Sequence, residues 1–133
     1  MEKIIPIETS VGFLKGRDCI YIDTVLQNEN SSLTFKGELN SNLLTDTKRN
    51  KDFLPYKLVF PQILAVFYCE LDTYSNLNQP KSSMFDLIEN SEWLESILIR
   101  EDYDKSIYKH YRLSTYDYVF DIISIGYRLD IIQ

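Results

Sequence analysis

His110 is the residue best suited to acid–base chemistry, because it is the single histidine of the chain. It lies where Tyr111 and Leu113 alternate with polar residues, which predicts a strand with His110 on its polar face. Tyr116 and Asp117 can turn the chain, so Asp117 could orient the imidazole from across a hairpin. An imidazole held in this way can act as a general base. The alternative is an exposed strand residue that makes one hydrogen bond.

Two groups of carboxylates could bind a cation or share a proton. Glu70 and Asp72 are expected two residues apart on one face of a strand, where neighbouring like charges favour the protonated form of one group. The alternative is an acidic rim at the exposed end of that strand. Glu101, Asp102 and Asp104 lack the glycine and the ligand spacing of a calcium-binding loop, so we expect a solvated turn.

The sequence contains none of the common catalytic or metal-binding signatures. There is no phosphate-binding glycine loop, GxSxG, HExxH or CxxC motif. Cys19 and Cys69 lie in apolar runs without zinc-type spacing, which predicts two small buried thiols in a reducing cytoplasm. We therefore predict no cofactor, no metal site and no enzymatic activity. A small enzyme that uses His110 with Asp117 is an alternative.

Tyrosine is concentrated in the last third of the chain, where six of the ten tyrosines are interleaved with aspartates. Tyrosine combines a large contact area with a polar tip and is enriched in protein interfaces. The alternative is that these rings cover a β core with their hydroxyls in water. The predicted partner-binding residues are Tyr103, Tyr108, His110, Arg112, Tyr116, Asp117 and Tyr118.

The charge balance favours a basic protein as the partner. Twenty acidic and fourteen basic residues leave a formal net charge of −6. Nucleic-acid binding needs a basic patch, and the densest basic cluster, Lys48, Arg49 and Lys51, is flanked by Asp46 and Asp52. Nucleic acid and anionic membranes are therefore not expected as partners, whereas a basic protein would be attracted at long range. The alternative is that the negative net charge only keeps the protein soluble.

The elements that must position these residues are mainly strands. The 133 residues suffice for one domain, 1–133, and the scarcity of alanine beside abundant tyrosine, phenylalanine and isoleucine favours sheet. We expect an edge strand at 4–7 and a hairpin whose strands flank the polar loop 27–31. In the first strand of that hairpin, Ile20, Ile22 and Leu26 are expected on one face. In the second, Leu33 and Phe35 alternate with polar residues.

The remaining strands are expected at 56–60, 63–72, 84–88, 110–114, 119–125 and 127–131. The strand at 63–72 is apolar on both faces, which is typical of a central strand. A helix near residues 90–99 is expected, capped by Asn90 or Ser91, with a start at Ser82 or Ser83 as the alternative. The fold class is mainly β (α+β): an antiparallel sandwich or open barrel of about seven or eight short strands with one helix.

No targeting or spanning segment is expected. The first residues, Met1 to Pro6, lack the apolar stretch of a signal peptide. The longest apolar run, 58–69, is interrupted by Pro61 and Gln62 and is too short to cross a bilayer as a helix. We therefore predict a cytoplasmic protein without membrane contact.

Three aromatic-rich motifs stand out in residues 83–129: Phe85-Asp86-Leu87-Ile88-Glu89-Asn90-Ser91-Glu92-Trp93-Leu94, His110-Tyr111-Arg112-Leu113 and Tyr116-Asp117-Tyr118-Val119-Phe120-Asp121. In the order of these motifs the chain resembles small uncharacterised bacterial proteins, some of which look like immunity partners of contact-dependent or polymorphic toxins. The resemblance implies a non-enzymatic, cytoplasmic, protein-binding role, and it carries no defined site residues.

The leading hypothesis from sequence is thus a protein-binding module, specifically an immunity-type inhibitor that covers a basic toxin domain with an acidic, tyrosine-rich face. The alternatives are a small-ligand carrier with an aromatic barrel mouth, the enzyme named above, and a homo-oligomer that associates through exposed sheet edges.

Overall fold

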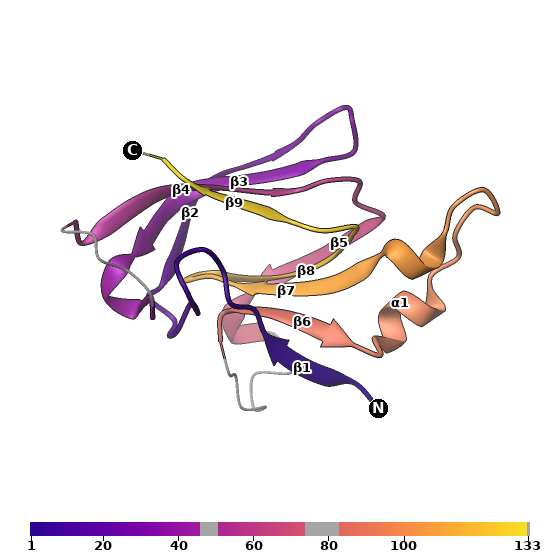
Figure 1. Cartoon of the computed structure of the whole chain (residues 1–133), viewed down its shortest axis with the longest axis horizontal. Helices are drawn as coiled ribbons and strands as arrows, with labels where there is room; N and C mark the ends of the chain where they lie inside the picture. Colours follow the sequence, from indigo (N-terminus) through magenta and orange to yellow (C-terminus); the bar gives the residue numbers. More distant parts are fainter. Residues whose placement is uncertain (46–50, 74–82, 133) are drawn as a thin grey trace.

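The computed structural model describes residues 1–45, 51–73 and 83–132, which form nine strands in two antiparallel sheets and one short α-helix (Figure 1). The five-stranded sheet has the order β1 (Lys3–Pro6), β6 (Phe85–Glu89), β7 (Lys109–Ser114), β8 (Tyr118–Ser124), β5 (Ala65–Glu70). The four-stranded sheet has the order β2 (Ile20–Gln27), β3 (Leu33–Asn40), β4 (Phe53–Phe60), β9 (Arg128–Ile131). The expected mainly-β class is confirmed, and the two sheets form a sandwich.

Aromatic rings from both sheets fill the space between the layers. Phe35 of β3 contacts Phe120 of β8 edge to face, with ring centroids 4.9 Å apart, and Phe60 of β4 contacts Phe85 of β6 at 6.0 Å. All four rings are buried. Because such edge-to-face pairs add to the hydrophobic gain of burial, they hold the two layers together.

The β2–β3 hairpin forms as predicted, but a bulge changes its facing pattern. Ile22 pairs with Gly37 and Thr24 pairs with Lys36, so Asp23 is an extra residue in β2. The bulge reverses the alternation. Val25, which pairs with the buried Phe35, lies on the inner face of the sheet although it is 41% exposed, and Leu26, 52% exposed, lies on the outer face. The prediction that Leu26 shares a face with Ile20 and Ile22 is therefore wrong.

Gly37 makes room for this bulge. A Cβ on Gly37 would lie 1.9 Å from the carbonyl oxygen of Tyr21, inside any allowed contact. The same carbonyl accepts a hydrogen bond from the Tyr56 hydroxyl at 3.0 Å. The main chain of β2 thus lies unusually close to Gly37 of β3, and the hydrogen bond from Tyr56 of β4 stabilises this approach.

The predicted strand at 63–72 corresponds to β5, but its predicted central position is wrong. β5 is the last strand of its sheet, and among the described strands it pairs only with β8. Burial between two neighbouring strands therefore does not explain why both faces of β5 are apolar.

The C-terminal third forms the predicted hairpin and extension. β7 and β8 pair directly, and β9 crosses to the other sheet and pairs with β4. Three short 3-10 turns connect the strands: η1 (Ser41–Leu43), η2 (Leu71–Thr73) and η3 (Lys105–Ile107). Of the basic cluster, Lys48 and Arg49 lie outside the described residues.

The helix α1 (Glu92–Ser96) begins where the sequence predicted. Ser91 caps it, because its Oγ accepts a hydrogen bond from the amide of Leu94 at 3.0 Å. The alternative start at Ser82 or Ser83 is wrong, since Phe85–Glu89 forms β6. Figure 1 shows α1 beyond the end of β6, beside the segment that returns to β7.

Replacing Gly37 by alanine is expected to lower the free energy of unfolding by about 3 kcal/mol, because the added methyl meets main chain that cannot rotate away. Gly126→Ala is the matched control, since nothing lies within 4 Å of a Cβ there; we expect a change within about 0.5 kcal/mol. Urea denaturation of both variants measures the difference. Equal stabilities would contradict the close approach of β2 to β3.

Candidate functional site

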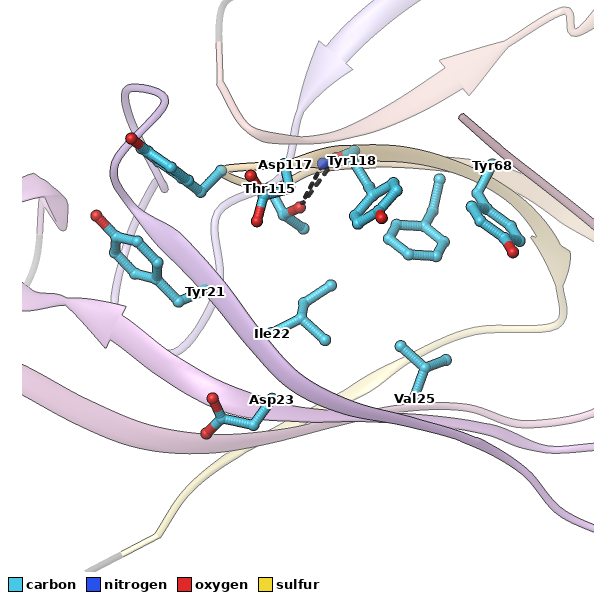
Figure 2. Close-up of a pocket in the computed structure, with 10 residues that line it drawn as sticks. Tyr21, Ile22, Asp23, Val25, Tyr68, Thr115, Asp117 and Tyr118 are labelled. Carbon is cyan, nitrogen blue, oxygen red and sulfur yellow. Dashed lines mark hydrogen bonds between the residues drawn. The ribbon is translucent and has the colours of Figure 1, made fainter. Parts of the chain in front are cut away.

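An aromatic pocket opens where β2 of one sheet faces β5 and β8 of the other (Figure 2). Its volume is about 400 Å³. Five rings line it, those of Tyr21, Tyr68, Tyr116, Tyr118 and Phe120, together with the residues Ile22, Val25, Thr115, Asp23 and Asp117. In Figure 2 the side chains of Tyr68 and Tyr118 point from one sheet toward Ile22 and Val25 of the other. The pocket is thus lined mainly by rings and aliphatic side chains, and two of its lining residues are acidic.

A tight turn between β7 and β8 positions one wall of the pocket. The amide of Thr115 donates to the carbonyl of Tyr118 at 2.7 Å, and the Thr115 hydroxyl accepts from the amide of Tyr118 at 3.0 Å. The amide of Tyr116 donates to the carbonyl of Ile20 in β2 at 2.9 Å. This last bond joins the two sheets directly, so Tyr116 and Asp117 are held on a rigid support.

Tyr116 also takes part in a stack of a cation and two rings. Its ring stacks on that of Tyr21 with centroids 5.3 Å apart, and the guanidinium of Arg17 lies over it at 5.3 Å. Arg17 donates to the Tyr116 carbonyl at 3.1 Å and pairs with Asp72 at 3.3 Å. Removal from water, followed by the charge of Asp18 and the neighbouring Tyr116, raises the pKa of Tyr21. Like any tyrosine hydroxyl near neutral pH, that of Tyr21 is protonated and can donate a hydrogen bond.

Tyr68 forms the opposite wall together with β8. Its ring stacks on that of Phe120 at 5.4 Å and meets that of Tyr118 edge to face at 6.0 Å. Tyr68 nevertheless remains 59% exposed and Tyr118 43% exposed. These rings hold one another in place while much of their surface stays available for contact.

The structure divides the seven predicted binding residues among three places. Tyr116, Asp117 and Tyr118 line the aromatic pocket. Tyr103 and Tyr108 line a second pocket of about 500 Å³ beside the β2–β3 and β4–β5 turns. His110 and Arg112 lie on the outer face of the five-stranded sheet, and His110 is buried. Tyr21, Asp23 and Tyr68 also line the aromatic pocket. The sequence analysis did not identify them, because they come from β2 and β5, which are distant in sequence from the β7–β8 turn.

His110 takes part in a buried chain of hydrogen bonds, so the interpretation of this residue as exposed is wrong. Its Nε2 lies 2.7 Å from Asp121 Oδ1, and its Nδ1 lies 2.7 Å from Ser91 Oγ. Arg112 Nε donates to the same Asp121 oxygen at 3.0 Å. The carboxylate that orients His110 is therefore that of Asp121, whereas Asp117 lies at the aromatic pocket. We call this chain the Ser91–His110–Asp121 network.

A serine, a histidine and an aspartate in one hydrogen-bonded chain also occur in serine hydrolases, where the serine attacks a substrate carbonyl. Here Ser91 is only 4% exposed, and its Oγ already accepts the Leu94 amide as the cap of α1. The ring of Trp93 packs edge-on against His110, with centroids 5.2 Å apart. We therefore assign the network a structural role, in which it fastens α1 to β7 and β8.

The prediction that Glu70 and Asp72 share one face of a strand is wrong. β5 ends at Glu70, and Asp72 lies in η2, where it pairs with Arg17. Residues 1–45, 51–73 and 83–132 contain no group of three or more histidine, cysteine or acidic side chains placed to hold a metal ion. Cys19 is buried and Cys69 half-buried, both as free thiols, and burial raises the pKa of Cys19 to about 12.

Comparison with protein-family models, with curated proteins and with solved structures gives no match. In the part of the chain that the structure describes, no helix is long and apolar enough to cross a membrane.

Replacing Ser91 by alanine is expected to lower the free energy of unfolding by about 2 kcal/mol, since the helix cap and the partner of His110 Nδ1 are lost together. Ser96→Ala is the control in the same helix, because Ser96 makes one exposed bond to the Trp93 carbonyl; we expect less than about 0.5 kcal/mol. Thermal and urea unfolding would measure both. Similar losses for the two variants would remove the structural role of the network.

Proposed function

We propose that the chain is a non-enzymatic protein-binding module that holds a basic segment of a partner protein in the aromatic pocket. The observation that carries the proposal is the placement of Asp23 and Asp117 around a pocket walled by exposed tyrosines. Carboxylates and aromatic rings are the two groups that bind lysine and arginine side chains best.

The chain itself contains an example of this chemistry. The guanidinium of Arg17 lies over the ring of Tyr116 while it pairs with Asp72. Tyr68 and Tyr118 offer exposed rings of the same kind on the other wall, with Asp117 next to Tyr118 in the turn. A cationic side chain of a partner could be held there in the same way, with its aliphatic stem against the rings.

The net charge of −6 supports a basic partner at longer range. Opposite net charges steer two proteins together and raise the association rate, and salt screens the effect. The aromatic pocket would then provide the short-range contacts that retain the partner, because tyrosine is prominent among the residues that dominate binding energy.

The resemblance of residues 83–129 to immunity-type proteins suggests a specific form of this function. In that form the chain acts in the cytoplasm as an inhibitor that covers the surface of a basic toxin domain. Inhibition of this kind requires tight occupation of the toxin surface and no chemistry by the inhibitor.

A small-ligand carrier is the second candidate, favoured by the size of the pocket. About 400 Å³ lies within the range of sites that hold small organic molecules. The carrier would retain a compound through purification, which native mass spectrometry detects as a second mass. The binding module would give the mass of the protein alone.

Tyr118→Ala and Asp117→Asn are each expected to weaken binding of a basic partner by about tenfold, which corresponds to about 1.4 kcal/mol. Tyr103→Ala is the matched control, since Tyr103 and Tyr118 are both 43% exposed and Tyr103 lies at the second pocket. Tagged wild type and variants would be used to capture partners from the host lysate at low and moderate salt. Quantitative mass spectrometry then identifies proteins that wild type and Tyr103→Ala retain and the pocket variants lose.

A basic protein that follows this pattern and weakens with salt would support the proposal. If the pocket variants retain every partner as well as Tyr103→Ala does, the aromatic pocket is not the binding surface.

A further inference from the structure

The strand β5 has the composition of a central strand although it lies at an edge. Its residues run Ala65-Val66-Phe67-Tyr68-Cys69-Glu70, and both Phe67, on the outer face, and Tyr68, on the inner face, are more than half exposed. Apolar residues on both faces are typical of a strand with a neighbour on each side. The structure supplies one neighbour, β8, among the described residues.

The other edges of the two sheets carry features that discourage pairing with a further strand. β1 contains Lys3 and Pro6, β2 contains the bulge at Asp23, and β9 carries the exposed ion pair of Arg128 and Asp130. Charged residues, proline and bulges are the usual means by which proteins protect sheet edges. β5 has no lysine and no proline, and its pairing with β8 runs without a register shift. Within residues 1–45, 51–73 and 83–132 it is therefore an unprotected edge.

The hydrogen-bond pattern identifies the main-chain groups that face outward from β5. The amide of Leu71 donates to the carbonyl of Asp117, which continues the β5–β8 ladder by one step. Since inward and outward groups alternate in an antiparallel pair, Phe67 and Cys69 bond to β8. The amides and carbonyls of Val66 and Tyr68 then point away from β8, toward the open edge.

A strand placed along this edge would reach the aromatic pocket with every second side chain. The pocket lies between β5 and β2, so side chains on the inner face of the new strand would point between Tyr68 and Val25. A long aliphatic stem would lie against these apolar walls, and a cationic head would reach Asp23 or Asp117. The outward side chains would cover Phe67.

We propose that the partner adds an extended segment of its chain to the open edge of β5 as a sixth strand, with lysine or arginine at alternate positions directed into the aromatic pocket. This inference rests on the proposed function and specifies its geometry. Main-chain hydrogen bonds to Val66 and Tyr68 would supply sequence-independent affinity, and the pocket would select basic side chains.

Charge separates this occupant from a second copy of the chain. Two copies joined through β5 would each bring a net charge of −6 and the same pair of pocket carboxylates toward one shared edge. Like charges brought together at an interface oppose association, whereas a basic segment neutralises them. A self-associated dimer would appear as a doubled mass when the free protein is measured by size-exclusion chromatography with light scattering.

The probe is a displayed library of random ten-residue peptides, selected on the immobilised wild-type protein. Enriched peptides are expected to carry lysine or arginine at alternate positions. Their affinities would be measured by fluorescence anisotropy against wild type, Val66→Ala and Val66→Pro. The two variants lose the same side chain, and only proline removes the outward amide, so Val66→Pro should bind about tenfold more weakly than Val66→Ala.

A second measurement does not depend on the folding of Val66→Pro. The enriched peptide would be synthesised with N-methyl groups on either of its two alternating sets of amides. A peptide added as a strand donates only one set to β5, so one methylated form should lose binding by about tenfold while the other binds nearly as well as the parent.

Equal binding of Val66→Pro and Val66→Ala, together with tolerance of both methylated forms, would overturn strand addition. Failure to enrich any basic peptide would also overturn it, because an extended segment alone is sufficient in this mechanism. Dimerisation of the free protein through β5 would assign the edge to a second copy. The capture experiment with the Tyr118 and Asp117 variants reports separately on the proposed function, so the two can fail independently.

Discussion

A sandwich of two open sheets ends in four edge strands, and the outward main-chain groups of each edge must bond to water or to another chain. In this protein three of those edges carry such features: β9 has an ion pair, β1 has a proline and a lysine, and β2 has a bulge. The fourth, β5, carries apolar and aromatic residues on both faces. The aromatic pocket lies beside this fourth edge, since Tyr68 of β5 lines it. In the proposed function, binding would therefore depend on this one strand.

The opposite side of the pocket depends on two local contacts between elements far apart in sequence. Gly37 lets β2 approach β3 and accommodates the bulged Asp23, which lines the pocket. The bond from the Tyr116 amide to the Ile20 carbonyl ties the β7–β8 turn to the edge of β2. The Ser91–His110–Asp121 network performs a comparable task on the outer face of the sheet, where it fastens α1. Polar groups in this molecule thus mostly fix the positions of the apolar and aromatic surfaces.

Local patterns predicted most of the elements, because strand alternation, turn residues and the Ser91 cap act over a few neighbouring residues. The position of a strand within its sheet is a property of the whole chain, and for this reason β5 was predicted to be central. Leu26 was assigned to the wrong face because nothing in the local alternation marks the bulge at Asp23. His110 was assigned to an exposed face because α1 covers it from outside the hairpin. One sequence signal pointed to Asp121 as a partner on this face. A hairpin that turns at Tyr116 and Asp117 places Arg112 directly opposite Asp121, and the β7–β8 register contains this pair. The four tyrosines predicted to bind a partner lie at two separate pockets, because Tyr103 and Tyr108 flank η3 whereas Tyr116 and Tyr118 belong to the β7–β8 turn and the start of β8.

The central claim is that the edge of β5 is open in the free protein and available to a further strand. Amide hydrogen exchange followed by NMR tests it most directly, residue by residue along β5. An open edge predicts that the amides of Val66 and Tyr68 exchange about a hundredfold faster than those of Phe67 and Cys69, which bond to β8. Equal protection of all four amides would mean that another part of the chain, or a second copy, already covers this edge, and would contradict the account.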